Sequence, residues 1–240
     1  MTRNRGQRII TESKLRGIYD KPSDRAIAKQ LDHLDQYCQQ FIKLSPFVLL
    51  ATTDRKGRID VSPRGGTPGF VYCADDHTLY LPDRRGNNRL DSLTNIVQTT
   101  NVGLLFMVPG FIECVRVAGS AQISQGPDNL VLAEDKEKPP VSIIQITVEE
   151  AFFQCGKSLI RSRLWDPETR VDRNIMPGLG RFAFHQVGIQ LIQPDLPFLF
   201  FRPVTTKTIL SQDWLHFLAK GFQAGGRGFG ACRTDGENTC

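Results

Sequence analysis

A cluster of basic and amide side chains near the middle of the chain has the composition of a phosphate-binding site. The stretch LYLPDRRGNNRLDSL, residues 79–93, places Arg84, Arg85 and Arg89 around one glycine and two asparagines. An arginine guanidinium can pair with two phosphate oxygens at once, and such charge-assisted hydrogen bonds are about twice as strong as neutral ones. These residue types therefore indicate a site for an anion.

The elements predicted on either side would place this cluster at the start of a helix. Residues 78–81 have the composition of a strand that ends at Pro82, and the periodic apolar residues that follow predict a helix over residues 90–97. The first N–H groups of a helix lack internal partners, and the helix dipole adds partial positive charge there. We therefore predict that the N–H groups of residues 88–90 bind phosphate together with the arginines. The alternative is a solvated basic turn in which one of the two asparagines caps the helix.

Length and composition restrict the classes of protein that the chain can be. Its 240 residues, 40% hydrophobic and 23% charged, are ordinary for a soluble globular protein with a sizeable core. No apolar run reaches about 18 residues, so we predict no membrane span, and the basic N-terminus lacks the apolar region of a secretory signal. The six cysteines and four histidines are scattered, so we predict a reduced, cytoplasmic setting and no metal. Cys155 is expected to be buried and inert.

The chain carries a net charge of +5 and has a pI of about 9.0. This balance suits an acidic or phosphorylated partner. Nucleic acid is one alternative, but the basic residues are dispersed, and neither zinc-finger spacing nor an aromatic RNA-binding signature accompanies them. A phosphorylated small molecule explains the same charge.

Two terminal regions flank the part of the chain with regular patterns. Residues 1–22 are polar and Arg-rich and form an N-terminal arm, whereas residues 188–240 show no coherent periodicity and form a C-terminal extension. Just after the arm, apolar residues recur at helical spacing and predict one helix over residues 24–44.

Short β-rich segments separated by turns predict a mainly β protein. The predicted strands are residues 47–53, 58–62, 70–73, 78–81, 102–108, 112–123 and 142–148. Residues 63–69 are rich in Gly and Pro and are predicted to be a loop. Residues 102–108 are apolar at nearly every position, which predicts burial on both faces. Most gaps are too short for a helix after each strand, so a barrel or sandwich is favoured over a parallel sheet.

Five segments, taken in order, resemble one family. They are FVLLATTDRKGRIDVSPRGG (47–66), LYLPDRRGNNRLDSLTNI (79–96), VGLLFMVPG (102–110), CVRVAGSAQI (114–123) and AFFQCGKSLIRSRLWDP (151–167). Together they are similar to the pyridoxamine 5′-phosphate oxidase-like family, the flavin mononucleotide (FMN)-binding split barrels. The resemblance implies a six-stranded antiparallel split β-barrel with flanking helices, over a domain of residues 23–187. It also implies a homodimer with one FMN in each of two clefts at the dimer interface.

The resemblance also implies which side chains contact FMN. Those that would grip its phosphate are Arg84, Asn87, Asn88, Arg89 and Ser92. At the end of the second strand, Ser62 and Arg64 correspond to groups near the flavin.

Further along the chain, Arg116 is a candidate contact whose alternative is an outward-facing strand residue. The residues that correspond to a segment contributed by the partner subunit are Lys157, Arg161 and Trp165. For Trp165, interface packing is an equal alternative to stacking on the flavin.

The function implied by the resemblance is that of an FMN-dependent oxidoreductase with a small-molecule redox substrate, in which the flavin carries the chemistry. No residue demands the role of general acid or base, so no catalytic residue is assigned. The Arg/His-rich substrate-binding tail of the pyridoxamine 5′-phosphate oxidases is not recognisable, so the substrate is not assigned either. Two alternatives are a non-catalytic flavin-binding store or sensor and a basic nucleic-acid-binding barrel, which would bind with a steep salt dependence.

Overall fold

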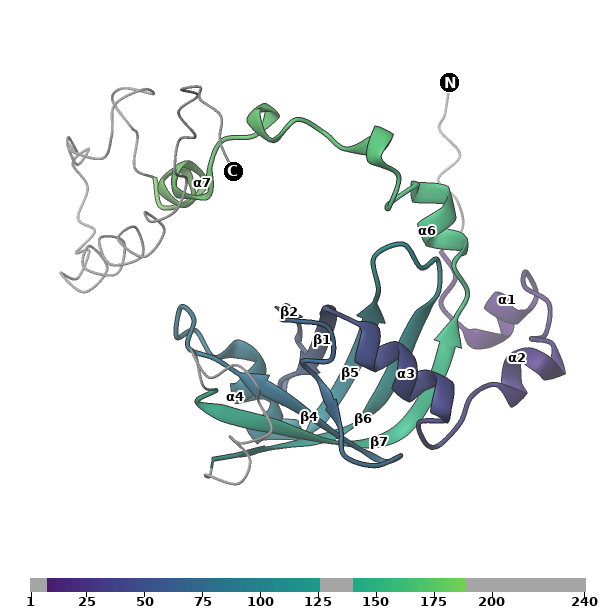
Figure 1. The fold of residues 1–240 in the computed structure, drawn as a ribbon. Helices are drawn as coiled ribbons and strands as arrows, with labels where there is room; N and C mark the ends of the chain where they lie inside the picture. Colours follow the sequence, from purple (N-terminus) through teal and green to yellow (C-terminus); the bar gives the residue numbers. More distant parts are fainter. Residues whose placement is uncertain (1–7, 126–139, 189–240) are drawn as a thin grey trace, which may run out of the picture. The chain divides into compact units, whose positions relative to one another are not determined.

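The chain divides into two units, residues 1–170 and residues 171–240. Figure 1 shows the computed structural model, which describes residues 8–125 and 140–188. Within those residues, no helix combines the length and the apolar character needed to cross a membrane. The first unit contains the whole described β-sheet, so the elements that position the candidate site belong to it.

The second unit is described only as far as residue 188. It contains a short 3₁₀ helix, Arg173–Ile175, and helix α7, Leu179–Gln186. Apart from its first residue, the predicted C-terminal extension lies outside the described residues.

One antiparallel sheet forms the centre of the first unit (Figure 1). Its strands are β1 (Phe47–Thr53), β2 (Ile59–Gly65), β3 (Tyr72–Cys73), β4 (Thr78–Asp83), β5 (Asn101–Met107), β6 (Cys114–Ser124) and β7 (Ser142–Gln154). Their order in the sheet is β2-β1-β5-β6-β7-β4-β3. The mainly β, antiparallel fold is thereby confirmed. Its seven strands correspond to the seven segments predicted from the sequence, one more than the six that the resemblance implied. The backbone pairings of the described strands leave β2 and β3 as edges, so the sheet is open and not a closed ring.

The first unit has five described α-helices and one 3₁₀ helix, Pro167–Thr169. The α-helices are α1 (Glu12–Arg16), α2 (Asp24–Ala28), α3 (Gln36–Leu44), α4 (Asp91–Thr99) and α6 (Lys157–Ser162), and α3 and α4 pack against the sheet. The predicted single helix over 24–44 is wrong, because the backbone of Leu31 pairs with Ala151 of β7 through hydrogen bonds of 2.8 and 3.0 Å. The chain re-enters a helix only at α3, where the Asp35 carboxylate accepts from Cys38 N at 2.7 Å and caps the helix.

A single buried cluster holds the sheet and two helices together. It includes Leu50 of β1, Phe106 of β5 and Leu79 of β4, along with Ile42 of α3 and Ile96 of α4. Each such side chain contributes about 1.5–3 kcal/mol when it is fully buried. Because strands from both ends of the sheet contribute to one core, the sheet must curl around that core.

Strand β5 shows how the two faces of the sheet differ. Val102, Leu104 and Phe106 are buried, whereas the alternate residues Gly103 and Leu105 are only half-buried. The prediction that this strand is buried on both faces is therefore wrong. A strand alternates its side chains between faces, and only the inner face here meets the core.

The longest strand pair contains a bulge, which favours the curl. The β6–β7 register shifts between Ala118 and Gly119, and bulges of this kind bend a strand and increase its twist. A Cβ atom on Gly119 would lie 1.9 Å from the carbonyl oxygen of Thr147. Only glycine therefore fits at this close approach.

We predict that Gly119→Ala lowers the free energy of unfolding by about 1–3 kcal/mol or more, because the added methyl group must displace backbone. The matched control is Gly103→Ala, where a Cβ would lie 3.9 Å from its nearest neighbour, Ala51 Cβ. Urea denaturation of both variants measures the difference. Equal stability of the two variants would contradict the close approach at the bulge.

The cysteines of the first unit differ in exposure. Burial, followed by a hydrogen bond with Asp35, raises the pKa of the Cys38 thiol to about 12, and burial raises the pKa of Cys73 to about 11. Cys155 is exposed, so the expectation that it is buried is wrong. It follows β7 at the point where the chain leaves the core.

At pH 8 we predict that iodoacetamide modifies Cys155 well before Cys38 and Cys73, because the thiolate is the reactive form and both buried thiols stay protonated. Peptide mass spectrometry over a time course measures each rate. In urea the three rates should converge. A native-state rate for Cys38 as high as that for Cys155 would disprove the burial of Cys38.

Candidate functional site

A cleft of about 300 Å³ opens where β2 approaches the segment between β4 and α4. Its walls are residues 60–64 on one side and residues 83–93, Arg85 excepted, on the other. The predicted site residues that line it are Ser62, Arg64, Arg84, Asn87, Asn88, Arg89 and Ser92. The fold thus brings together two stretches that were assigned separately from the sequence.

Both strands at the cleft run further than the sequence predicts. Strand β2 continues through Pro63, and β4 continues through Pro82, although these prolines were expected to lie in a loop and to end a strand. Proline is tolerated at a sheet edge, where no ladder hydrogen bond is lost. Strand β2 is an edge, and β3 pairs with β4 only at Leu79 and Tyr80, so each proline has a strand neighbour on one side only.

An ion pair crosses the cleft between the ends of these two strands. Arg64 Nη1 of β2 donates to Asp83 Oδ1 of β4, and the two side chains are 19% and 11% exposed. Strands β2 and β4 are not hydrogen-bonded to each other, because four other strands separate them in the sheet. Side chains therefore join the two ends of the curled sheet where backbone pairing does not.

Helix α4 starts later than predicted. Its first residue is Asp91, and Leu90 precedes it in the left-handed conformation with φ of 59° and with no side-chain cap. The N–H groups without intrahelical partners therefore belong to residues 91–93, and the prediction of residues 88–90 is wrong. The predicted asparagine cap is wrong as well: Asn87 Oδ1 accepts from Arg89 N at 3.1 Å and stabilises the preceding turn.

Carboxylates occupy part of the cleft that was expected to be basic. Arg89 Nε donates to Asp91 Oδ2 at 2.7 Å, and the Arg89 side chain is 73% exposed. This hydrogen bond and the charge of Asp91 raise the pKa of the Arg89 guanidinium above its ordinary value. An anion bound at the start of α4 would therefore have to compete with Asp91 for Arg89.

Ser92 has its own carboxylate partner. Its side chain is buried, and its Oγ donates to Asp60 Oδ2 at 2.6 Å. The hydroxyl proton of Ser92 is therefore committed to Asp60 in this arrangement. Ser92 offers oxygen lone pairs to the cleft more readily than a donor.

Three acidic residues of the cleft, Asp60, Asp83 and Asp91, were missed from the sequence. Asp91 had a signal, since acidic residues favour the first turn of a helix. The other two had none. Their partners Ser92 and Arg64 lie 32 and 19 residues away, and only the tertiary fold makes them neighbours.

Arg116 does not line the cleft. It is exposed on β6, and its guanidinium lies 5.1 Å from the centroid of the Phe152 ring of β7. Such a cation–π contact stabilises the outer surface of the sheet. The structure thus places Arg116 on the outward face, which was the alternative considered for it.

The three residues assigned to the segment after β7 do not line the cleft of their own chain either. Lys157 and Arg161 are exposed on α6, and Trp165 Nε1 donates to the carbonyl oxygen of Phe111 at 2.7 Å. That bond ties the segment to the turn between β5 and β6.

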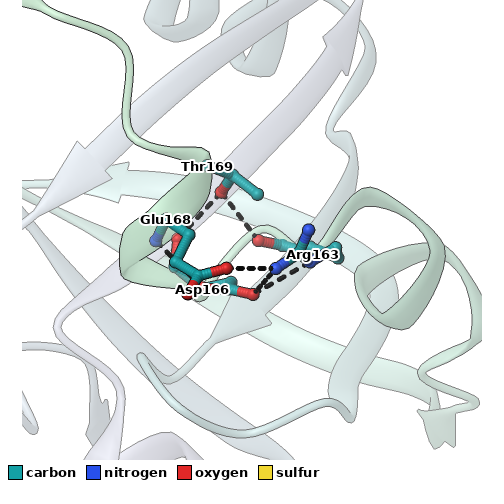
Figure 2. A network of polar contacts seen from close by, with 4 residues as sticks. All are labelled: Arg163, Asp166, Glu168 and Thr169. Atoms are coloured by element: carbon teal, nitrogen blue, oxygen red, sulfur yellow. Dashed lines mark hydrogen bonds and ion pairs between the residues drawn. The ribbon is translucent and has the colours of Figure 1, made fainter.

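Figure 2 shows a compact polar network of Arg163, Asp166, Glu168 and Thr169 at the end of this segment. Arg163 Nε donates to Asp166 Oδ2 at 2.9 Å, and Arg163 Nη2 lies 3.0 Å from Glu168 Oε2. Thr169 Oγ1 donates to the carbonyl oxygen of Arg163 at 3.0 Å. These contacts stabilise residues 163–169, and Lys157 and Arg161 on the preceding helix are exposed.

The donors and acceptors of the cleft suit a ligand that carries an anionic group beside other polar atoms. Arginine side chains and the free N–H groups at the start of α4 suit the anion, and the three carboxylates suit hydroxyl or N–H donors. Among the described residues, no group of three or more His, Cys, Asp and Glu side chains could hold a metal ion. That the protein uses no metal stays a prediction.

Comparison with known proteins gives one family and several similar solved structures. Residues 34–155 of the 240 match the family model described as pyridoxamine 5′-phosphate oxidase. Against the curated proteins, the chain has no match.

Three solved structures are similar over about half of this chain. HupZ of Group A Streptococcus is 21% identical, with 50% of this chain and 94% of that chain covered and a TM-score of 0.42. An FMN-binding protein of Syntrophomonas wolfei is 12% identical, with 48% and 82% covered and a TM-score of 0.38. The heme storage protein HutZ of Vibrio cholerae is 10% identical, with 51% and 94% covered and a TM-score of 0.35.

Proposed function

The chain belongs to the pyridoxamine 5′-phosphate oxidase-like family, and from this membership and the cleft together we propose that it is an FMN-dependent oxidoreductase. The observation that carries the proposal is the meeting of Arg64, Arg84 and Arg89 with the start of α4 in one cleft. These are the groups that a phosphate monoester requires. When bound, FMN would supply the redox chemistry, and the chain's residues would bind and orient it.

The side chains of the cleft fit the phosphate end of this cofactor. Arg84 and Arg89 would donate to the phosphate, together with Asn87, Asn88 and the N–H groups of residues 91–93. Ser62 and Arg64 lie on β2 at the opposite wall and would contact the part of FMN nearer the ring. Arg64 supports this fit because its Nε is buried and has no hydrogen-bond partner.

The size of the cleft supports a homodimer. At about 300 Å³ it is at the low end of the range for sites that enclose a drug-sized ligand, roughly 300–1,000 Å³. A site of this size is small for a cofactor with a phosphate, a ribityl chain and a three-ring flavin. We infer that a second chain completes the site as a split barrel dimer, with Lys157, Arg161 and Trp165 of the partner segment facing the cofactor.

The proposal includes a small-molecule redox substrate, a cytoplasmic setting and no role for nucleic acid. The competing function is that of a flavin-binding protein without turnover. Both functions need the same cleft, so they differ only in whether the bound flavin is reduced and reoxidised. A nucleic-acid-binding protein would need a basic surface, whereas Asp60, Asp83 and Asp91 lie among the arginines of this cleft.

We predict that the purified protein has a flavin-type visible spectrum, or acquires one on addition of FMN, and releases FMN on denaturation. Absorbance spectroscopy and chromatography of the released chromophore measure this. Oxidation of NAD(P)H or another reductant by oxygen would support the enzyme over the binding protein. A colourless protein that takes up no added FMN would refute the proposed function.

We predict that Arg89→Ala weakens FMN affinity by about tenfold or more, since it removes a charge-assisted donor at the start of α4. Arg89→Lys should recover only part of the lost affinity, because an ammonium group keeps the charge but cannot donate to two phosphate oxygens in the planar geometry of a guanidinium. Asp91→Asn should strengthen affinity, because it removes the competing carboxylate. Fluorescence titration of the apoprotein with FMN measures all three.

The matched control is Arg85→Ala, which removes the same charge from the same loop but from a residue that does not line the cleft. Its affinity should stay close to that of the parent. If Arg85→Ala and Arg89→Ala weaken binding equally, net charge alone explains the effect, and the assigned position of the phosphate is wrong.

A further inference from the structure

Asp83 is held firmly by the backbone around it. It is the last residue of β4 and lies opposite Ser142 of β7. Its carbonyl oxygen accepts from Val141 N at 2.8 Å. Only 11% of its side chain is exposed, so the carboxylate has a fixed place at the wall of the cleft. A side chain on a strand is positioned more rigidly than one on a loop.

Arg64 reaches Asp83 from the other end of the sheet. It lies opposite Val48 in the β1–β2 pair, at an edge strand whose outer side has no strand neighbour. An arginine side chain has many rotamers, and the ion pair selects one of them. Among the described residues, the hydrogen bond to Asp83 Oδ1 is the contact that joins the guanidinium to the far wall of the cleft.

One donor of the guanidinium remains unused. Arg64 Nε is buried, and no described residue accepts a hydrogen bond from it. A buried N–H without an acceptor is unfavourable, and such groups in native structures call for an explanation. Because Arg64 lines the cleft, a ligand that displaces the atoms covering Nε can supply an oxygen atom as that acceptor.

We propose that Asp83 is a positioning residue that holds Arg64 across the open end of the sheet and leaves Arg64 Nε for an oxygen atom of the ligand. In this role Asp83 acts on the ligand through Arg64. The identity of the ligand as FMN rests on the proposed function, whereas the holding of Arg64 by Asp83 does not.

The direction in which Asp83→Ala changes ligand affinity distinguishes a positioning role from simple electrostatics. Asp83→Ala removes a negative charge from a cleft that binds an anion, so charge alone predicts tighter binding. Loss of positioning predicts weaker binding. Without Asp83, Arg64 adopts other rotamers, and the entropy lost when the ligand orders Arg64 again lowers the affinity. Asp83→Asn removes the same charge but keeps an oxygen acceptor for Arg64, so it should recover part of the lost affinity.

The experiment titrates the parent and these two variants with FMN and follows the Nε–H resonance of Arg64 by ¹⁵N NMR. The matched control is Asp54→Ala, because Asp54 also pairs with an arginine, Arg58, and its side chain is 10% exposed, but it does not line the cleft. Thermal unfolding of each variant reports on the fold. If Asp83→Ala does not fold, the comparison of Asp83→Asn with the parent provides the test.

We expect Asp83→Ala to weaken FMN binding by about tenfold or more, Asp83→Asn to weaken it less, and Asp54→Ala to leave it unchanged. We also expect the Arg64 Nε–H to be protected from exchange in the parent, to lose protection in the Asp83 variants and to shift with FMN. Tighter or unchanged binding by Asp83→Ala would overturn the proposal. So would an Arg64 Nε–H in the parent that exchanges as fast as that of exposed Arg58.

The two proposals fail in different ways. A parent that binds no FMN but whose Arg64 Nε–H loses protection in the Asp83 variants would refute FMN as the ligand and support the positioning of Arg64. If the parent binds FMN but the Arg64 Nε–H exchanges equally slowly in the parent and in the Asp83 variants, FMN is supported as the ligand and the positioning of Arg64 by Asp83 is refuted.

Discussion

The candidate site depends on the curl of one open sheet around one core. Strand β2 and strand β4 lie far apart in the order of the sheet, yet their ends meet because side chains from both halves pack into the same buried cluster. The longest strand pair has a bulge at Gly119, and a bulge bends a strand and increases its twist. Where the two ends meet, the ion pair between Arg64 and Asp83 takes the place of a backbone ladder.

The same geometry explains why the cleft is both basic and acidic. Each of two arginines of the cleft has a carboxylate partner: Asp83 pairs with the largely buried Arg64, and Asp91 pairs with the exposed Arg89. Such pairs hold the donors in place, but an anionic ligand has to compete with them. The burial of the two pairs differs greatly, since the Arg89 side chain is 73% exposed and the Arg64 side chain only 19%. Arg89 is therefore the more easily released, and Arg64 the more rigid.

The sequence predicts the type of fold and the identity of many cleft residues, because β-rich segments, turn residues and clustered arginines are local signals. The prediction fails where the tertiary environment overrides a local signal of the sequence. Pro63 and Pro82 were expected to interrupt strands, but each lies where a missing N–H loses no ladder bond. The helix over 24–44 is broken at Leu31 by a backbone bridge to β7, which is 120 residues away in the chain.

The start of α4 shows the same limit at the site itself. An asparagine is a favourable cap, but here Leu90 occupies that position, in a left-handed conformation that sequence patterns do not predict for leucine. The partnerships of Asp60 and Asp83 could not be predicted, because they join residues that only the curl brings together. Local patterns therefore locate the segments of the cleft, and the fold decides which atoms face each other.

A crystal structure of the protein grown with FMN would show whether the cleft between β2 and the start of α4 holds the phosphate of FMN. We expect electron density for the phosphate within hydrogen-bonding distance of Arg84 or Arg89 and of the first N–H groups of α4. A phosphate bound to residues outside 60–64 and 83–93 would contradict it.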